Sequence, residues 1–74
     1  MNSTPDAYWQ AIGLAAPARR ALIGAGIMTI HDVATWHAVD LAQLHGIGVH
    51  AMIRLRQALA DAQLSFADEP RTSD

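Results

Sequence analysis

The residues best suited to chemistry are Gly46 and Gly48, two glycines between an apolar segment and a longer helix-like segment. Glycine leaves the backbone accessible, and free N–H groups at the start of a helix bind anions. His50 follows the glycines and donates to a phosphate more readily when protonated. The pattern predicts a phosphate site in which hairpin amides bind and nearby cations add charge. The predicted site residues are Gly46, Ile47, Gly48, His50, Arg54 and Arg20.

Packing alone also explains this hairpin. Leu41 and Leu44 precede the glycines and are predicted to anchor the incoming helix, while Ile47 enters the core between the two glycines. Ala51 is small enough for two helices to approach closely. The sequence therefore leaves two interpretations of the hairpin: it binds a phosphate, or it serves only as the turn between two packed helices.

A protein-binding surface is the alternative to a nucleic-acid site. Val49 and Ile53 form an apolar line beside the inner face of the last helix. An exposed apolar line on a small domain is a candidate contact surface, and Tyr8 and Trp9 of the N-terminal segment would extend it. The other interpretation is that the N-terminal helix folds over Val49 and Ile53 and covers them.

Catalysis and metal binding find little support in the sequence. The absence of cysteine excludes disulfides and thiolate metal sites. Neither the pair His31 and His37 nor the pair His45 and His50 places two imidazoles on one helical face. No nucleophile with a neighbouring base, carboxylate pair or phosphate loop is present. We therefore expect a non-enzymatic protein with no metal and no small-molecule cofactor.

Chain length, hydropathy and charge exclude several classes of protein. A chain of 74 residues allows one domain, and no apolar run approaches the ~20 residues of a membrane span. The N-terminus lacks the basic and apolar segments of a signal peptide, so we expect a cytoplasmic protein that does not bind membranes. The net charge is −2, but residues 18–64 hold four arginines against three aspartates, and the acidity lies in the flanks.

Helix start and stop signals divide the chain into five helices. Thr4 and Pro5 are typical of a helix start, and Gly13 and Gly26 are typical of helix ends. Thr29 is predicted to cap a third helix with Asp32 as its capping-box partner. The expected helices cover 5–12, 17–25, a segment after residue 29, 38–44 and 49–63. No segment alternates with a period of two, so the expected fold class is all-α.

The sequence predicts three regions: an N-terminal capping helix in 1–13, a helical domain in 14–66 and a disordered acidic tail in 67–74. The last helix carries an inner apolar stripe with helical spacing. Its members are Ala51, Met52, Leu55, Ala58, Leu59 and Ala62.

Residues 14–66 resemble the helix-hairpin-helix proteins, and more closely the C-terminal domain of the bacterial RNA polymerase alpha subunit and its small stand-alone relatives. Four segments carry the resemblance in order: Ala21-Leu22, Ala25-Gly26-Ile27-x-Thr29-Ile30-x-Asp32-Val33, Leu41-x-x-Leu44-x-Gly46-Ile47-Gly48 and Leu59-Ala60-x-Ala62-Gln63-Leu64-Ser65. The resemblance implies a compact five-helix, SAM-like domain of tandem helix-hairpin-helix type that binds the DNA minor groove and contacts transcription proteins.

The positions that bind DNA in that family differ here. Pro17 stands where the family has its main groove arginine, and Arg20 takes the polar position one turn later. Val49 and His50 replace a basic pair, and Ala51 replaces a small hydroxyl residue. We therefore expect a small binding module that contacts DNA weakly and without sequence specificity in a transcription-related setting. The alternative is a protein-interaction adapter that kept the fold and lost the DNA contacts.

Overall fold

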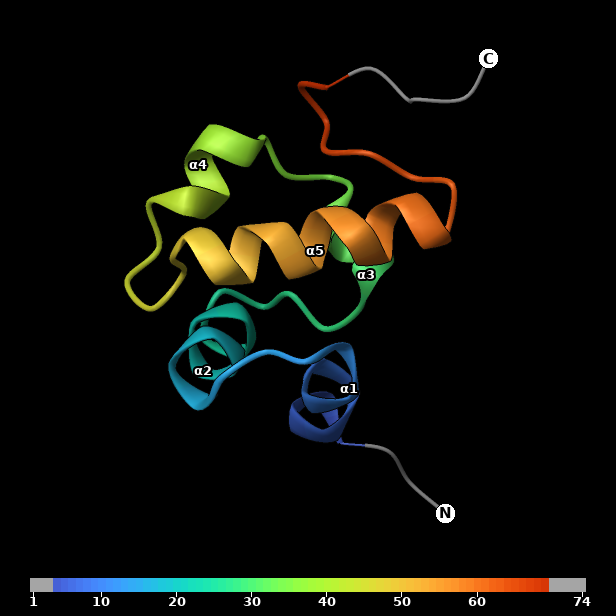
Figure 1. Ribbon diagram of the computed structural model, residues 1–74. Coiled ribbons are helices and arrows are strands. Elements are labelled where there is room, and N and C mark those ends of the chain that lie inside the picture. Colours follow the sequence, from blue (N-terminus) through green and yellow to red (C-terminus); the bar gives the residue numbers. More distant parts are fainter. Residues whose placement is uncertain (1–3, 70–74) are drawn as a thin grey trace.

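A computed structural model describes residues 4–69 of the chain, and these residues contain five helices joined by loops (Figure 1). They are α1 Pro5–Ile12, α2 Ala16–Gly24, α3 Ile30–Val33, α4 Ala38–Ala42 and α5 Val49–Asp61. These described residues contain no β-strand, so the predicted all-α class with five helices is confirmed. None of the five helices is long and apolar enough to cross a lipid bilayer.

Side-chain caps explain where α1 and α3 begin. Thr4 Oγ1 accepts a hydrogen bond from Ala7 N at 3.1 Å. At α3, Thr29 Oγ1 accepts from Asp32 N, and Asp32 Oδ2 accepts from Thr29 N at 3.1 Å, which completes the predicted capping box. These bonds satisfy N–H groups that have no partner within their own helix.

A left-handed glycine ends α2, as the sequence predicts. Gly26 has a φ of +80°, and Ile27 N donates to Leu22 O at 2.9 Å. This bond brings the chain back across the last turn of the helix and leaves Ile27 buried in the core. The helix itself begins one residue earlier than predicted, at Ala16, and ends at Gly24.

The end of α5 uses the same backbone motif without a glycine. Gln63 has a φ of +61°, and Leu64 N donates to Leu59 O at 2.7 Å. The helix therefore ends at Asp61, two residues before the predicted end. For the same reason Ala62, which was expected on the inner stripe, is exposed.

The core lies along α5, which crosses the middle of the molecule in Figure 1. Contacts join α1 to α2 and to α5, and α3 to α5. The largest side chain that is fully buried is Trp9 of α1, so the N-terminal helix contributes to the core rather than lying on its surface. The other large, fully buried side chains are Phe66, Leu22, Ile27, Leu41, Leu55, Leu59 and Val33.

The segment after α5 folds back over the domain. Phe66 is 1% exposed, and Ala67 N donates to Trp36 O at 2.8 Å. Arg56 of α5 forms an ion pair with Glu69, and its guanidinium carbon lies 5.1 Å from the centroid of the Phe66 ring. Burial of Phe66 therefore fixes the start of a segment whose composition suggests disorder.

This segment is where the structure differs from the predicted tail of 67–74. Residues 67–69 are hydrogen-bonded to the domain, because burial of Phe66 brings the polar groups that follow it against the first residues of α4 and the side of α5. The rest of the predicted tail, 70–74, lies outside the described residues.

Asp68 caps α4 from a distant part of the chain, and this cap predicts a pH dependence. Its Oδ1 accepts from Ala38 N at 2.9 Å, and this bond holds the pKa of the Asp68 carboxyl below its usual value. A carboxyl whose pKa is depressed on folding stabilises the fold above its unfolded pKa, and the stabilisation is lost as the pH falls through the folded value.

We therefore expect Asp68→Asn to lower the free energy of unfolding at neutral pH and to have a shrinking effect below about pH 4. Urea denaturation of both proteins across this range measures it. An effect of constant size from neutral to strongly acidic pH would contradict the assignment.

Candidate nucleic-acid interface

A tight corner joins α4 to α5. Leu41 has no exposed surface and Ile47 is only 7% exposed, so both sides of the corner are anchored in the core. Gly46 has a φ of +101°, and a Cβ at this position would lie 2.6 Å from Pro17 O of α2. Gly46 is therefore needed for the backbone angle and for the close approach of α2, whether or not the hairpin binds a ligand.

Gly48, in contrast, lies in open space at the start of α5. A Cβ there would have no neighbouring atom within 4 Å, and no side chain caps the helix. The first helical hydrogen bond runs from Met52 N to Gly48 O at 3.0 Å. The N–H groups of Gly48, Val49, His50 and Ala51 donate to no other described residue. The start of α5 therefore presents unpaired backbone donors.

The helix α2 is the other helix that starts without a capping side chain, because Ala15 occupies its cap position. Threonines cap α1 and α3, and Asp68 caps α4. The N-terminal end of a helix carries a partial positive charge. The two helices that leave this end uncapped are also the two that border a common hollow.

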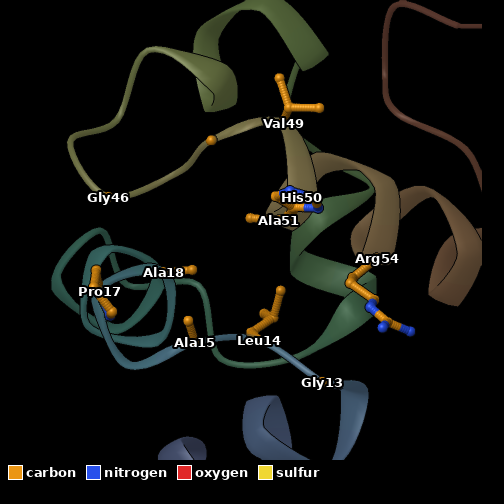
Figure 2. Close-up of a pocket in the computed structure, with 11 residues that line it drawn as sticks. Gly13, Leu14, Ala15, Pro17, Ala18, Gly46, Val49, His50, Ala51 and Arg54 are labelled. Carbon is orange, nitrogen blue, oxygen red and sulfur yellow. The ribbon is translucent and has the colours of Figure 1, made fainter.

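This hollow has a volume of about 390 Å³ and lies between the loop after α1, the start of α2 and the first turns of α5 (Figure 2). Its lining includes Ala15 at the cap position of α2, Ala18 within α2 and Gly48 from the hairpin. The titratable side chains in the lining are His50 and Arg54, and the lining contains no carboxylate. The hollow therefore combines two helix N-termini with an arginine and a histidine.

Two of the four described arginines are used for internal contacts. Arg19 Nε donates to Asp6 Oδ1 at 2.8 Å, and Arg19 Nη1 donates to Leu14 O at 2.7 Å. Arg56 is paired with Glu69. Arg19 therefore needs no external anion, although its place in the first turn of α2 is one where a cation is unfavourable.

Arg20 and Arg54 form no ion pair with any carboxylate of the described residues. Arg54 lines the hollow, and a Cβ on Gly13 across the hollow would lie 3.5 Å from Arg54 Nε. Arg20 lines a neighbouring hollow of about 450 Å³, which shares Pro17 and Gly46 with the first. The two unpaired arginines thus lie on either side of the contact between Pro17 and Gly46.

The structure brings most of the predicted phosphate site together. Gly46, Gly48, His50 and Arg54 line one hollow, and Arg20 lines the adjacent one. Ile47 differs from the prediction, because its side chain is buried and its N–H donates to Leu44 O at 3.0 Å. That amide is occupied and is not free for a phosphate.

Sequence reasoning predicted Arg20 of α2 as a site residue but missed the uncapped start of this helix. Its only signal is Ala15, which stands where serine, threonine, aspartate or asparagine commonly caps a helix. The sequence does not show that this uncapped end faces the start of α5. That juxtaposition depends on the corner at Gly46 and its contact with Pro17.

The alternative protein-binding surface is only partly available. Val49 is 73% exposed and Ile53 is 57% exposed, so α1 does not cover them. Tyr8 is half-buried, but Trp9 has no exposed surface, and its Nε1 donates to Ile27 O at 3.1 Å. Trp9 is therefore a core residue and cannot contact a partner in this structure.

Residues 4–69 contain no group of three or more histidine, cysteine, aspartate or glutamate side chains that could hold a metal ion. No family model, curated protein or solved structure matches the chain. The resemblance to the polymerase alpha-subunit domain stays a prediction from the residues that carry it. Because a fold alone does not define a function, a functional assignment for this protein depends on the geometry of the site.

Proposed function

We propose that the protein binds the phosphate backbone of DNA, weakly and without sequence specificity, at the hollow between α2 and α5. The observation that supports this most is the convergence of two uncapped helix N-termini on a hollow that holds His50 and Arg54 and no carboxylate. Backbone amides and arginines contact phosphate oxygens in a way that positions DNA without reading its sequence. The resemblance to the polymerase alpha-subunit domain favours DNA as the polyanion and a transcription-related setting.

In this proposal a phosphate enters the hollow and accepts hydrogen bonds from the free amides of Gly48, Val49 and His50. Arg54 supplies charge from one turn further along α5, and Arg20 contacts a neighbouring phosphate from the adjacent hollow. With so few cations and a net charge of −2, affinity is low and falls steeply with added salt.

NMR titration of the ¹⁵N-labelled full chain with a short DNA duplex tests this proposal. We expect shifts of the amides of 13–16, 18 and 46–54 that are clear at about 20 mM salt and mostly lost at about 200 mM. Arg54→Gln is expected to weaken binding by roughly 3- to 10-fold at the lower salt, because it removes one charged contact. Arg56→Gln is the matched control, since Arg56 is on the same helix but is paired with Glu69.

No shifts at millimolar duplex, or equal losses of affinity in the two arginine variants, would contradict DNA binding at this hollow.

The exposure of Val49 and Ile53 supports the second candidate function, a protein-interaction adapter. That function is favoured if the shifts at these two residues depend on protein concentration and not on DNA.

A further inference from the structure

Another hollow lies near the C-terminal end of α5. It is a groove of about 430 Å³ between α1 and the last turn of α5. Tyr8 and Ile12 form its wall on α1, Ala58 forms the wall on α5, and Ile30 at the start of α3 lies at its base. Tyr8 and Ile12 are half-buried, so a partner that covered them would remove further apolar surface from water.

The α1 wall of this groove is fixed by contacts inside the domain. Tyr8 Oη accepts from Ile30 N at 2.9 Å. The Tyr8 ring also packs edge-on against Trp9, with ring centroids 4.9 Å apart. The groove therefore exists before any partner binds, and binding does not have to order its wall.

The charge around the groove is opposite to that of the first hollow. Asp61 is the only charged residue in its lining and lies at the C-terminal end of α5, where the helix carries a partial negative charge. Neither α5 nor α1 has a basic residue in its last turn, and α1 also ends at the groove with Ile12. Asp61 Oδ1 accepts from Gln57 Nε2 at 3.0 Å but forms no ion pair among the described residues. This end of the domain therefore favours a cation.

We propose that the groove binds an amphipathic segment of a protein partner, which places a bulky apolar side chain against Tyr8 and Ile12 and a lysine or arginine beside Asp61. The apolar walls and the single uncompensated carboxylate select an occupant that is both apolar and basic. A second copy of the chain is the less suitable occupant. Its exposed large apolar residues, Met28, Val39, Val49 and Ile53, all lie outside the lining of the groove, and a contact between two different surfaces does not close into a symmetric dimer. This inference does not depend on DNA binding.

The test uses the ¹⁵N-labelled full chain and two synthetic amphipathic helical peptides of the same pattern, one built from leucine and lysine and the other from leucine and glutamate. We expect only the leucine-lysine peptide to shift the amides of 7–12 and 58–61. Asp61→Asn is expected to weaken this binding by roughly 3- to 10-fold and to reduce its salt dependence, because it removes the charge that attracts the lysines.

Matched variants of α1 separate the groove from the rest of the surface. Ala11 is exposed and lines the groove, whereas its neighbour Gln10 is exposed and does not. Ala11→Trp is expected to fill the groove and abolish binding of the leucine-lysine peptide, while Gln10→Trp leaves it unchanged. Asp61→Lys provides a second test that leaves the groove open, because it is expected to exchange the preference for the leucine-glutamate peptide.

Equal binding of the two peptides, an unchanged preference in Asp61→Lys, or binding by a folded Ala11→Trp protein would overturn the proposal. Shifts in the groove that depend only on protein concentration would identify a second copy as the occupant and would overturn it as well. Circular dichroism of each variant shows whether it is folded.

Discussion

Replacing Gly48 with aspartate is expected to make the protein more stable and to abolish its binding to DNA. Gly48 already has the extended backbone of a helix cap, with a φ of −110° and a ψ of −168°, and the space around it is open. An aspartate there accepts hydrogen bonds from the free amides of His50 or Ala51 and places a negative charge at the positive end of α5. Together these effects are expected to raise the free energy of unfolding by about 0.5 to 1.5 kcal/mol.

The same change removes what a phosphate needs. In Gly48→Asp the new carboxylate uses the free amides and repels a phosphate from the hollow, so affinity for duplex DNA is expected to fall at least roughly tenfold. Urea denaturation measures the gain in stability, and the NMR titration with duplex DNA measures the loss of binding. A variant that binds as the wild type does would show that the start of α5 takes no part in binding.

Two further substitutions at this position separate charge from capping. Gly48→Asn caps α5 without adding charge, so we expect a smaller loss of binding than in Gly48→Asp. Gly48→Ala adds neither cap nor charge, and its Cβ meets no atom within 4 Å, so the amides stay free. If all three variants lost binding equally, bulk at the mouth of the hollow would be the cause instead of the amides.

The uncapped start of α5 is a position where stability and the proposed function are opposed. A capping side chain here would stabilise the domain, as Thr4 and Thr29 do for their helices. Replacements of this kind commonly cost function where a site needs unpaired groups. Substitutions at Gly48 therefore best distinguish a phosphate-binding hairpin from a purely structural turn. Gly46 cannot do so, since the turn requires it in either case.

Local signals predicted the helices well because each one acts within a few residues. Thr4 and Thr29 begin their helices, and the left-handed Gly26 ends α2, as the sequence indicates. The prediction was wrong at the end of α5, where Gln63 takes the left-handed conformation that glycine more often supplies. Propensity does not identify such a residue, because the conformation is held by its neighbours: Leu64 N donates to Leu59 O, and Phe66 is buried in the core.

Long-range contacts are what the sequence did not predict. The sequence predicts that Asp68 belongs to an acidic tail, yet it caps a helix whose first residue lies thirty positions earlier in the chain. Nothing in the sequence distinguishes Ala15 from other alanines, yet it leaves α2 uncapped beside the start of α5. In the candidate site, the hairpin glycines, His50, Arg54 and Arg20 were predicted from the sequence, whereas the position of the uncapped start of α2 beside α5 depends on tertiary structure.

Removal of the Trp9 side chain is expected to cost the domain most of its stability. Trp9 has no exposed surface and packs with Tyr8 and the buried residues around α5, and its Nε1 donates to Ile27 O at 3.1 Å. Truncation of a buried tryptophan to alanine costs roughly 3 to 5 kcal/mol. The single core of a domain of 74 residues supplies a net stability of only about 3 to 5 kcal/mol, so Trp9→Ala is expected to be largely unfolded at 37 °C.

Urea denaturation and near-UV circular dichroism measure this effect, and Gln10→Ala on the exposed side of α1 is the control. Trp9→Phe retains most of the packing and loses the bond to Ile27 O, so its cost is expected to be smaller. A stable Trp9→Ala protein that loses a protein partner would instead support the interpretation of Trp9 as a contact residue.

Because the Trp9 ring fills the space between α1 and the rest of the core, we expect residues 14–66 without α1 to be unable to fold. The helix in 5–12 is therefore part of the domain, and Tyr8 is the aromatic residue of α1 that remains accessible to a partner.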